Sequence, residues 1–295
     1  MGRWGERFAY AVRTFVLRQE VPYLFGMVIT DRCNLNCFYC GSKNTGRYHF
    51  SSEGATTALR DAFRRGHRSL YFTGGEPMIW TDGGVNLGDL VRYSRELGFH
   101  DVFVFTNGTV PLTIRGCNYI VTIDGTRAIH ETVRSGTYDR IIENVRNAIS
   151  QAVFASITLS KHNVYCLEDF AKEIAALNIF RGISFNLLTH WPEMIAEHGI
   201  TGIERVQLLD RIWSLKQKGY PIVLSRAAYK ALRENSWKRP IPQIGLGTRD
   251  KVFTCCRDVD HKEICDTCGY ANCVEVSQIL ALKPSALLQV MKMVR

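Results

Sequence analysis

Residues 30–40 read TDRCNLNCFYC, so three cysteines follow the spacing C-x3-C-x2-C at Cys33, Cys37 and Cys40. Three thiolates this close together can bind one face of a metal cluster and leave one metal position without a protein ligand. Iron–sulfur clusters are normally held by four thiolates, so the open position is available to another ligand. Zinc sites typically use a second, distant cysteine pair, which this triplet does not match well. The motif therefore favours an iron–sulfur site over a zinc knuckle or a set of buried thiols.

Four predicted strands end in glycine or polar residues. Apolar runs predict buried strands at residues 23–30, 69–73, 102–105 and 119–123. The segments that follow these strands are the cysteine motif, Gly74-Gly75-Glu76-Pro77, Thr106-Asn107-Gly108 and Asp124-Gly125. Barrels and open α/β sheets bind ligands at the carboxyl ends of their strands. We therefore expect these four segments to meet at one site.

Strands and helices alternate along the chain. A fifth strand is predicted at residues 154–159 and a sixth at about residues 182–188. Helices are predicted at residues 138–151, 167–177, 202–218 and 226–235. Ile149 is placed on the apolar stripe of the first of these helices. The alternation predicts parallel strands with covering helices.

The cysteine motif and the GGEP strand end together resemble the radical S-adenosylmethionine (SAM) superfamily, from residue 20 to beyond residue 190. The resemblance implies an α/β fold: an open partial (β/α)6 TIM-like barrel with a small loop-rich, cysteine-containing C-terminal extension. We expect an N-terminal amphipathic helix at residues 1–19, the core barrel at 20–200 and a helical, cysteine-rich extension at 201–295. Pro240-Ile241-Pro242 begins a looped tail that we expect to cover the barrel mouth.

The resemblance also implies roles for individual residues. Cys33, Cys37 and Cys40 would bind a 4Fe–4S cluster whose fourth iron takes the amino and carboxylate groups of SAM, and Tyr39 would lie beside the adenine. The segment that would receive the SAM amino group is Gly74, Gly75, Glu76 and Pro77. Glycines allow a ligand to approach the backbone closely, and Glu76 would accept a charge-assisted hydrogen bond from the ammonium group. Further candidates for ribose, carboxylate or substrate contacts are Thr106, Asn107, Ser156, Thr158 and Asn186. The alternative for each of these polar residues is an ordinary strand-end cap.

Asp124 and Arg134 are candidate catalytic residues. Relatives with auxiliary clusters show an Asp-Gly, a His and an Arg-x-Gly at spacings similar to those of Asp124, His130 and Arg134. The resemblance implies that the planar Arg134 guanidinium clamps the SAM carboxylate. Asp124 would face the substrate and act in proton transfer or orientation. The alternative is a loop capped by Asp124, with Arg134 in a salt bridge.

A second group of cysteines lies near the end of the chain. The expected ligands are Cys256, Cys265, Cys268 and Cys273, with Cys255 as the alternative first ligand. These flanks resemble the shortened SPASM or twitch extensions of radical SAM enzymes, which implies a second, auxiliary 4Fe–4S cluster. Zinc and reduced structural thiols remain alternatives. Cys117 and Cys166 stand alone and are expected to be ordinary buried thiols.

Bulk properties limit the possible partners. Ten cysteines, eight of them in two clusters, favour metal chemistry in a reducing compartment over disulfides. No signal peptide or transmembrane run is visible, so we expect a cytoplasmic protein. A net charge of +9 suits an acidic electron donor such as flavodoxin or ferredoxin, while no nucleic-acid signature is visible. Residues 6–18, with Phe8, Val12, Phe15 and Val16 on one face, and residues 285–295 could also lie on a membrane surface.

The sequence thus predicts an enzyme that cleaves SAM reductively and directs a 5′-deoxyadenosyl radical at a substrate, by hydrogen abstraction or addition. A small molecule or lipid is preferred as substrate, partly because the length and amino terminus resemble the adenosylhopene synthase branch. A peptide substrate, as for SPASM-type relatives, is the alternative. A non-catalytic, zinc-stabilised nucleic-acid-binding protein is a distant third.

Overall fold

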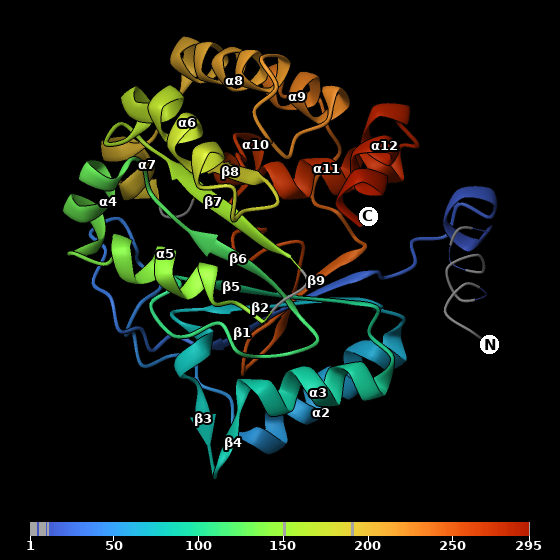
Figure 1. Cartoon of the computed structure of the whole chain (residues 1–295). Helices are drawn as coiled ribbons and strands as arrows, with labels where there is room; N and C mark the ends of the chain where they lie inside the picture. The colour runs from blue at the N-terminus through green and yellow to red at the C-terminus, as the bar shows by residue number, and fades with distance from the viewer. Residues whose placement is uncertain (1–4, 6–9, 11, 150–151, 190–191, 295) are drawn as a thin grey trace.

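The computed structural model describes residues 5, 10, 12–149, 152–189 and 192–294. Its main sheet has eight strands in the order β10-β9-β1-β2-β5-β6-β7-β8 (Figure 1). The six core strands are parallel and confirm the predicted ones: β1 (Leu24–Thr30), β2 (Ser69–Gly74), β5 (Asp101–Thr106), β6 (Asn118–Thr122), β7 (Val153–Leu159) and β8 (Ile183–Leu187). The fold is therefore the expected open partial (β/α)6 barrel, because continuous apolar runs form parallel strands that helices cover.

Helices surround this sheet (Figure 1). They are α2 (Ser52–Arg65), α3 (Leu87–Leu97), α4 (Arg127–Arg134), α5 (Tyr138–Arg146), α6 (Leu167–Leu177), α7 (Pro192–His198), α8 (Gly202–Gln217) and α9 (Arg226–Arg233). Short elements follow β2: a 3-10 turn at Pro77–Ile79 and the hairpin of β3 (Thr81–Asp82) and β4 (Val85–Asn86). The first turn of α3 is held by a capping box in which Asn86 and Asp89 satisfy each other's backbone amides.

The two faces of the central strands differ in exposure. In β5, Val102 and Val104 are completely buried in the core, whereas Phe103 and Phe105 on the opposite face keep some solvent access. The same alternation occurs in β6, where Ile120 is the half-buried side chain. Side chains alternate between the faces of a strand, so the half-buried set lines the inside of the barrel. The barrel interior is therefore not completely filled by side chains.

The C-terminal extension joins both edges of the core sheet. Its first strand, β9 (Ile244–Gly247), pairs in parallel with β1, and β10 (Val252–Thr254) pairs antiparallel with β9. Three helices follow: α10 (Lys262–Asp266), α11 (Ala271–Leu280) and α12 (Pro284–Val294). At the other edge, Tyr270 forms an isolated bridge with Asn186 of β8, and Leu187 N donates to Gly269 O at 3.0 Å. The extension therefore spans the open side between β1 and β8.

Several expected elements differ in detail. The helix predicted at residues 138–151 ends at Arg146, and Ile149 is 46 % exposed instead of lying on a buried stripe. The cause is local, because Ile149 N donates to Leu112 O and the chain has already left the helix. Within the predicted N-terminal helix, the structure has a π-helical turn at Val12–Val16 with Val16 71 % exposed, and Phe8 lies outside the described residues. None of the described helices is both long and apolar enough to cross a membrane.

Candidate functional site

The three motif cysteines lie on a loop that leaves β1 and returns at His49; we call residues 31–48 the cysteine loop. A bridge between Thr30 and His49 closes its base. The buried Asp31 carboxylate accepts hydrogen bonds from Thr45 Oγ1 and from Arg47 N (2.8 Å), and Asn44 Oδ1 accepts one from Cys33 N at 3.0 Å. These contacts fix the loop from within, so the three thiols are presented together at the carboxyl end of β1.

The Gly74-Gly75 segment packs directly on the start of the cysteine loop. Gly75 N donates to Thr30 O at 2.8 Å, and Glu76 N donates to Arg32 O at 2.8 Å. A Cβ at Gly74 would clash with Thr30 O, and one at Gly75 would lie 2.5 Å from Asp31 O. Gly74 also has φ of +149°, which favours glycine. The space left by these glycines is thus occupied by the chain itself, which ties the end of β2 to the cysteine loop.

Glu76 is completely buried and already has protein donors on both carboxylate oxygens. Oε1 accepts from Thr106 Oγ1 (2.7 Å) and Met78 N (3.0 Å), and Oε2 accepts from Asn107 N (2.7 Å). Burial raises the pKa of Glu76, while the hydrogen bonds from Asn107 and Thr106 oppose that rise. The carboxylate therefore joins the end of β2 to the end of β5, and an ammonium group could reach it only by sharing these donors. Pro77 begins the 3-10 turn that Glu76 caps.

Tyr39, Asp124 and Arg134 form one buried network beside the cysteine loop. Arg134 Nε donates to Asp124 Oδ2 at 2.6 Å and Arg134 Nη2 donates to Tyr39 OH at 2.7 Å, while Tyr39 OH donates to Asp124 Oδ2. Asp124 is 0 % exposed and Arg134 is 8 % exposed. Burial strongly raises the pKa of Tyr39. Burial lowers the pKa of Arg134, but Asp124, Tyr39 and Cys37 together raise it more, so the guanidinium stays charged. The expected salt-bridge alternative for Arg134 is thus present in this structure.

Two residues around Asp124 hold it in place. His130 Nδ1 accepts from Asp124 N at 3.3 Å, and His130 Nε2 contacts Thr137 Oγ1 at 3.1 Å. Asn163 Nδ2 donates to Asp124 O at 3.1 Å and to Thr158 O at 2.9 Å. Burial, with the positive charge of Arg134, lowers the pKa of His130 to about 4. The ring is therefore neutral near pH 7 and supports the network without adding charge.

The remaining strand-end candidates divide into two groups. Asn107 joins the cysteine loop, because its Nδ2 donates to Asn34 Oδ1 at 2.8 Å and lies 3.9 Å from Cys33 Sγ. Thr158 and Asn186 face each other across β7 and β8, and Asn186 Oδ1 is buried without a hydrogen-bond partner among the described residues. Ser156 is buried at 4 % exposure, with its carbonyl accepting from Ile123 N. Asn107 is thus next to the motif thiols, whereas Asn186 has a free acceptor near the extension.

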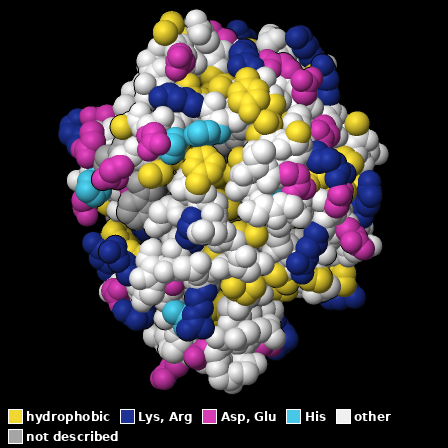
Figure 2. Space-filling view, turned by 90° about the vertical axis from the view of Figure 1, so that its left-hand side faces the viewer, with side chains coloured by type: hydrophobic (Ala, Val, Ile, Leu, Met, Phe, Trp, Pro, Cys, Tyr) yellow, Lys and Arg dark blue, Asp and Glu magenta, His cyan; other side chains and the backbone are white. Residues whose placement is uncertain are grey.

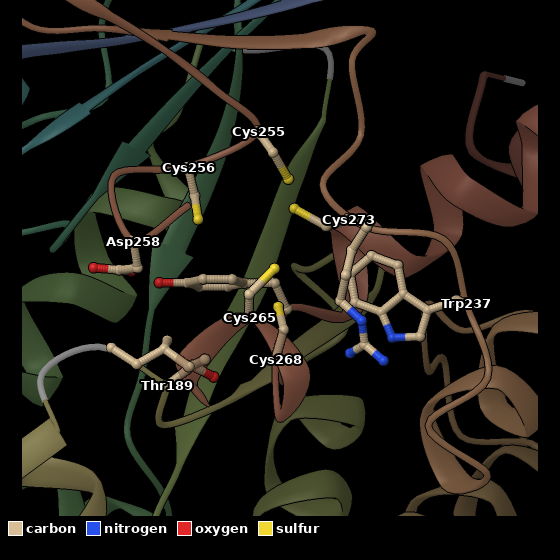
Figure 3. Close-up of a pocket in the computed structure, with 11 residues that line it drawn as sticks. Thr189, Trp237, Cys255, Cys256, Asp258, Cys265, Cys268 and Cys273 are labelled. Carbon is tan, nitrogen blue, oxygen red and sulfur yellow. The ribbon is translucent and has the colours of Figure 1, made fainter. Parts of the chain in front are cut away.

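All five tail cysteines line one hollow, which we call the thiol pocket: Cys255, Cys256, Cys265, Cys268 and Cys273 (Figure 3). Burial raises the pKa of Cys268 to about 12. The contact with Cys256 lowers the pKa of Cys255, but the Cys273 thiol and burial raise it more, to about 12. Cys255 has φ of +68°, an uncommon conformation for a residue with a side chain. Cys255 and Cys268 are therefore neutral until a metal displaces their protons.

The thiols of the cysteine loop and those of the thiol pocket both suit an iron–sulfur cluster. Among the residues that the structure describes, no three His, Cys, Asp or Glu side chains converge on a single-ion site as they stand. A tetrahedral zinc ion with Zn–S bonds of about 2.3 Å would draw its sulfurs to roughly 3.8 Å from one another. A cluster binds each thiolate through a different iron, so it accepts thiols that stand farther apart. By contrast, Cys117 and Cys166 lie in the core as buried free thiols, as expected.

Sequence reasoning missed several residues of these sites. Asn34 was inside the quoted motif but had no assigned role, and its Nδ2 donates to Thr109 Oγ1 at 2.7 Å. Asn163 is likewise a missed support of Asp124. Trp237 and Arg239 line the thiol pocket, although the sequence indicated no role there for either residue. A tryptophan followed by basic residues and a Pro-Ile-Pro segment is not a sequence pattern that indicates a metal site.

Exposed side chains on the face that carries α4 and α7 are mixed in type. Hydrophobic and histidine side chains gather near its centre, and Lys or Arg side chains are interspersed with Asp and Glu (Figure 2). Phe38, on the cysteine loop, is 45 % exposed and packs edge-on against His162 (4.7 Å between ring centroids) and His198 (5.3 Å). The positive charge is thus not concentrated in one patch on this face.

Comparison with known proteins identifies relatives by sequence. The family model described as "Radical SAM superfamily" matches residues 27–174. A "Probable GTP 3′,8-cyclase" of Methanothermobacter marburgensis is 31 % identical over 148 residues, 47 % of this chain and 47 % of the relative. One of Methanococcus maripaludis is 24 % identical over 161 residues, 52 % of this chain and 53 % of the relative. The chain therefore spans about half the length of the curated relatives it matches.

Solved structures with the same fold have low sequence identity. Streptococcus suis SuiB bound to precursor peptide SuiA matches with a TM-score of 0.63 and 11 % identity, covering 85 % of this chain and 63 % of that chain. Native anSMEcpe with bound AdoMet matches with a TM-score of 0.56 and 14 % identity, covering 90 % and 81 %. At these identities the likeness concerns the fold alone.

Proposed function

The chain belongs to the radical SAM superfamily, and from this premise we propose that it cleaves SAM reductively and uses the resulting radical on a small-molecule or lipid substrate. The observation that carries the proposal is the position of the three thiols on a fixed loop. This loop lies beside the Glu76 carboxylate, which joins the ends of β2 and β5, and beside the Tyr39–Asp124–Arg134 network. A 4Fe–4S cluster and SAM would supply the electron transfer and the 5′-deoxyadenosyl radical when bound.

Each part of the site has a defined task in this proposal. Cys33, Cys37 and Cys40 hold the cluster, and the Gly74–Pro77 segment, fixed by Glu76, presents backbone to the amino group of SAM. Arg134 turns from Asp124 toward the SAM carboxylate, or donates to it while keeping the Asp124 contact. Tyr39 lies where it can contact the adenine. Asp124 then positions the substrate from a strand end that His130 and Asn163 hold in place.

The barrel interior supports a small or lipid-like substrate. Tyr71 and Phe105 lie 5.5 Å apart on the half-buried inner face, and Tyr71 is close enough to the thiol pocket for Cys273 and Cys255 to contribute, after burial, to its raised pKa. The extension spans the open side of the barrel, which restricts access for a folded protein. The curated relatives are also named for GTP, a small molecule.

A peptide substrate is the second candidate. It is favoured by the fold likeness to SuiB, whose structure contains a precursor peptide. The position of the extension disfavours a peptide substrate, because an extended peptide would have to enter the barrel beside β9 or β8. Peptide and small molecule can be separated by testing which of them increases the rate of SAM cleavage.

The tail thiols complete the proposal. We assign the thiol pocket to an auxiliary 4Fe–4S cluster bound by Cys256, Cys265, Cys268 and Cys273, with Cys255 as the alternative first ligand and zinc as the alternative metal. Electrons for the cysteine-loop cluster come from an acidic donor such as flavodoxin or ferredoxin, which suits the net charge of +9. Apolar side chains exposed on α12, including Leu288 (58 %) and Met291 (55 %), suit peripheral membrane contact in the lipid variant of the proposal.

The test is iron and zinc content together with SAM cleavage under dithionite, for anaerobically purified wild type and a Cys33/Cys37/Cys40→Ala variant. We expect 5′-deoxyadenosine only from the wild type, with about four irons retained in the variant. Cleavage by the variant would refute the radical assignment of the cysteine loop. A variant that retains zinc or no metal would refute the auxiliary cluster while leaving the first assignment intact.

A further inference from the structure

Two N–H groups in the thiol pocket have no acceptor among the residues that the structure describes. Trp237 and Arg239 line this pocket together with the five cysteines (Figure 3 labels Trp237). Trp237 is 9 % exposed, and both Trp237 Nε1 and Arg239 Nη1 are buried without a hydrogen-bond partner in the described part of the chain. Indole and guanidinium groups only donate hydrogen bonds. An unmade buried donor costs about 1–3 kcal/mol, and a charged one costs more. The pocket therefore has room for an acceptor that the described residues do not supply.

The rest of Arg239 is held firmly, which fixes the direction of its free nitrogen. Arg239 Nη2 donates to Asn235 O at 3.0 Å and to Asn235 Oδ1 at 2.8 Å. The guanidinium also lies over the Trp237 ring, 4.5 Å from its centroid. Because the guanidinium is planar and rigid, holding one side fixes the other. Trp237 and Arg239 thus form one unit in the wall of the thiol pocket, with two N–H groups that have no acceptor among the described residues.

Arg239 also brings a positive charge to the wall of the thiol pocket. A second arginine in this region behaves differently: Arg205 Nη2 donates to Cys268 O at 2.9 Å, and Arg205 Nη1 donates to Thr267 O. Arg205 therefore binds the backbone that carries the cysteines, while Arg239 lines the pocket with an Nη1 that has no acceptor among the described residues.

We propose that Trp237 and Arg239 donate hydrogen bonds to the sulfur atoms of an iron–sulfur cluster in the thiol pocket and thereby raise its reduction potential. The inference rests on the proposed function, in which the tail cysteines hold such a cluster. Hydrogen bonds to cluster sulfurs and the net charge around a cluster both set its potential. One-electron reduction makes the cluster more negative, so N–H donors and a nearby positive charge stabilise the reduced state more than the oxidised state.

The experiment measures the midpoint potential of the tail cluster alone. Full-length Cys33/Cys37/Cys40→Ala protein serves as the background, and dithionite titration is followed by electron paramagnetic resonance. Arg239→Gln removes the charge and is expected to shift the reduction equilibrium at least tenfold toward the oxidised form, which is about 59 mV for one electron. Trp237→Phe removes one neutral donor and is expected to shift it in the same direction by less. Arg239→Lys, which keeps the charge but not the planar fork, is expected to fall between wild type and Arg239→Gln.

Matched controls separate this effect from general charge and packing. Lys238→Gln removes a positive charge one residue away, but its side chain is 80 % exposed and pairs with Glu20. Trp213→Phe removes an indole that stacks on Tyr229 instead of lining the thiol pocket. Both controls are expected to leave the midpoint potential unchanged, because neither group reaches the pocket.

The outcomes distinguish this inference from the proposed function. A background protein without iron refutes the auxiliary cluster and the inference with it. Full iron content with an unchanged potential in Arg239→Gln and Trp237→Phe refutes the inference alone. If Arg239→Gln fails to retain iron, the potentials of Arg239→Lys and Trp237→Phe decide by the same criterion.

Discussion

The cysteine loop and the thiol pocket use the same side chain in opposite surroundings. Cys33 and Cys40 are half-buried on a loop that polar contacts from Asp31 and Asn44 hold together. In the thiol pocket, Cys255 and Cys268 are each 8 % exposed, and two N–H groups of the pocket wall have no partner within the described part of the chain. The loop offers three thiols and the pocket offers five.

The difference indicates two different tasks. Three thiols beside a network of Tyr39, Asp124 and Arg134 leave one side open, which suits a cluster that must also bind a ligand from solution. Five thiols enclosed by the extension can satisfy a whole cluster from the protein alone. The comparison predicts that damage to one region leaves the other intact.

Removing one thiol from each region gives the strongest test. Cys37→Ala is expected to reduce 5′-deoxyadenosine formation to the background without enzyme while keeping the tail iron. Cys268→Ala is expected to lose the tail iron while keeping most SAM cleavage, because the two metal sites do not share a ligand. Iron analysis and chromatography of the nucleoside product measure both. Loss of cleavage in Cys268→Ala with the loop iron intact would show that the two regions are not independent.

The contact between the Gly74-Gly75 segment and the cysteine loop is the next test. Gly75→Ala is expected to lower the free energy of unfolding by about 3 kcal/mol, because its Cβ would be forced against backbone that cannot move aside. Loop iron should fall and tail iron should remain. Thermal unfolding and iron content measure these effects. Gly54→Ala, in the first turn of α2, is the matched control and should be close to wild type. Full loop iron in Gly75→Ala would contradict this role.

The support of Asp124 by His130 predicts a pH dependence specific to the cysteine-loop region. The folded protein keeps His130 neutral down to about pH 4, whereas the unfolded chain binds a proton below about pH 6.5. The free energy of unfolding should therefore fall by up to about 3 kcal/mol as the pH drops from 6.5 to 4. His130→Gln should flatten this part of the profile, measured by urea unfolding. His261→Gln, at a surface site, should not; an unchanged slope in His130→Gln would contradict the assignment.

The fifth thiol provides the smallest effect. If Cys256 is the ligand, Cys255→Gly keeps the tail iron and changes the stability of the metal-free protein little, because relief of the φ of +68° offsets the loss of a small buried side chain. Cys256→Ala should then lose tail iron. Iron content and thermal unfolding of both variants decide the assignment. The reverse pattern would identify Cys255 as the ligand.

Local sequence determined the core strands and the motif thiols. A buried parallel strand is apolar along most of its length. Local apolar runs were therefore enough to predict β1, β2, β5, β6, β7 and β8. The positions of Cys33, Cys37 and Cys40 follow from spacing within eight residues. By contrast, β9 contains two glycines shortly after Pro240-Ile241-Pro242, which indicates a loop. Its strand forms because β1 offers a free edge for pairing.

Only the tertiary structure decided which distant residues meet. Asn107 reaches Asn34 from 73 positions away, and Asp124, Arg134 and Tyr39 come from three segments of the chain. Trp237 and Arg239 join the tail thiols because the extension crosses from β1 to β8 and encloses them. Local periodicity and spacing report only on neighbours in sequence, whereas these contacts depend on long-range strand pairing and on buried polar groups that must find partners.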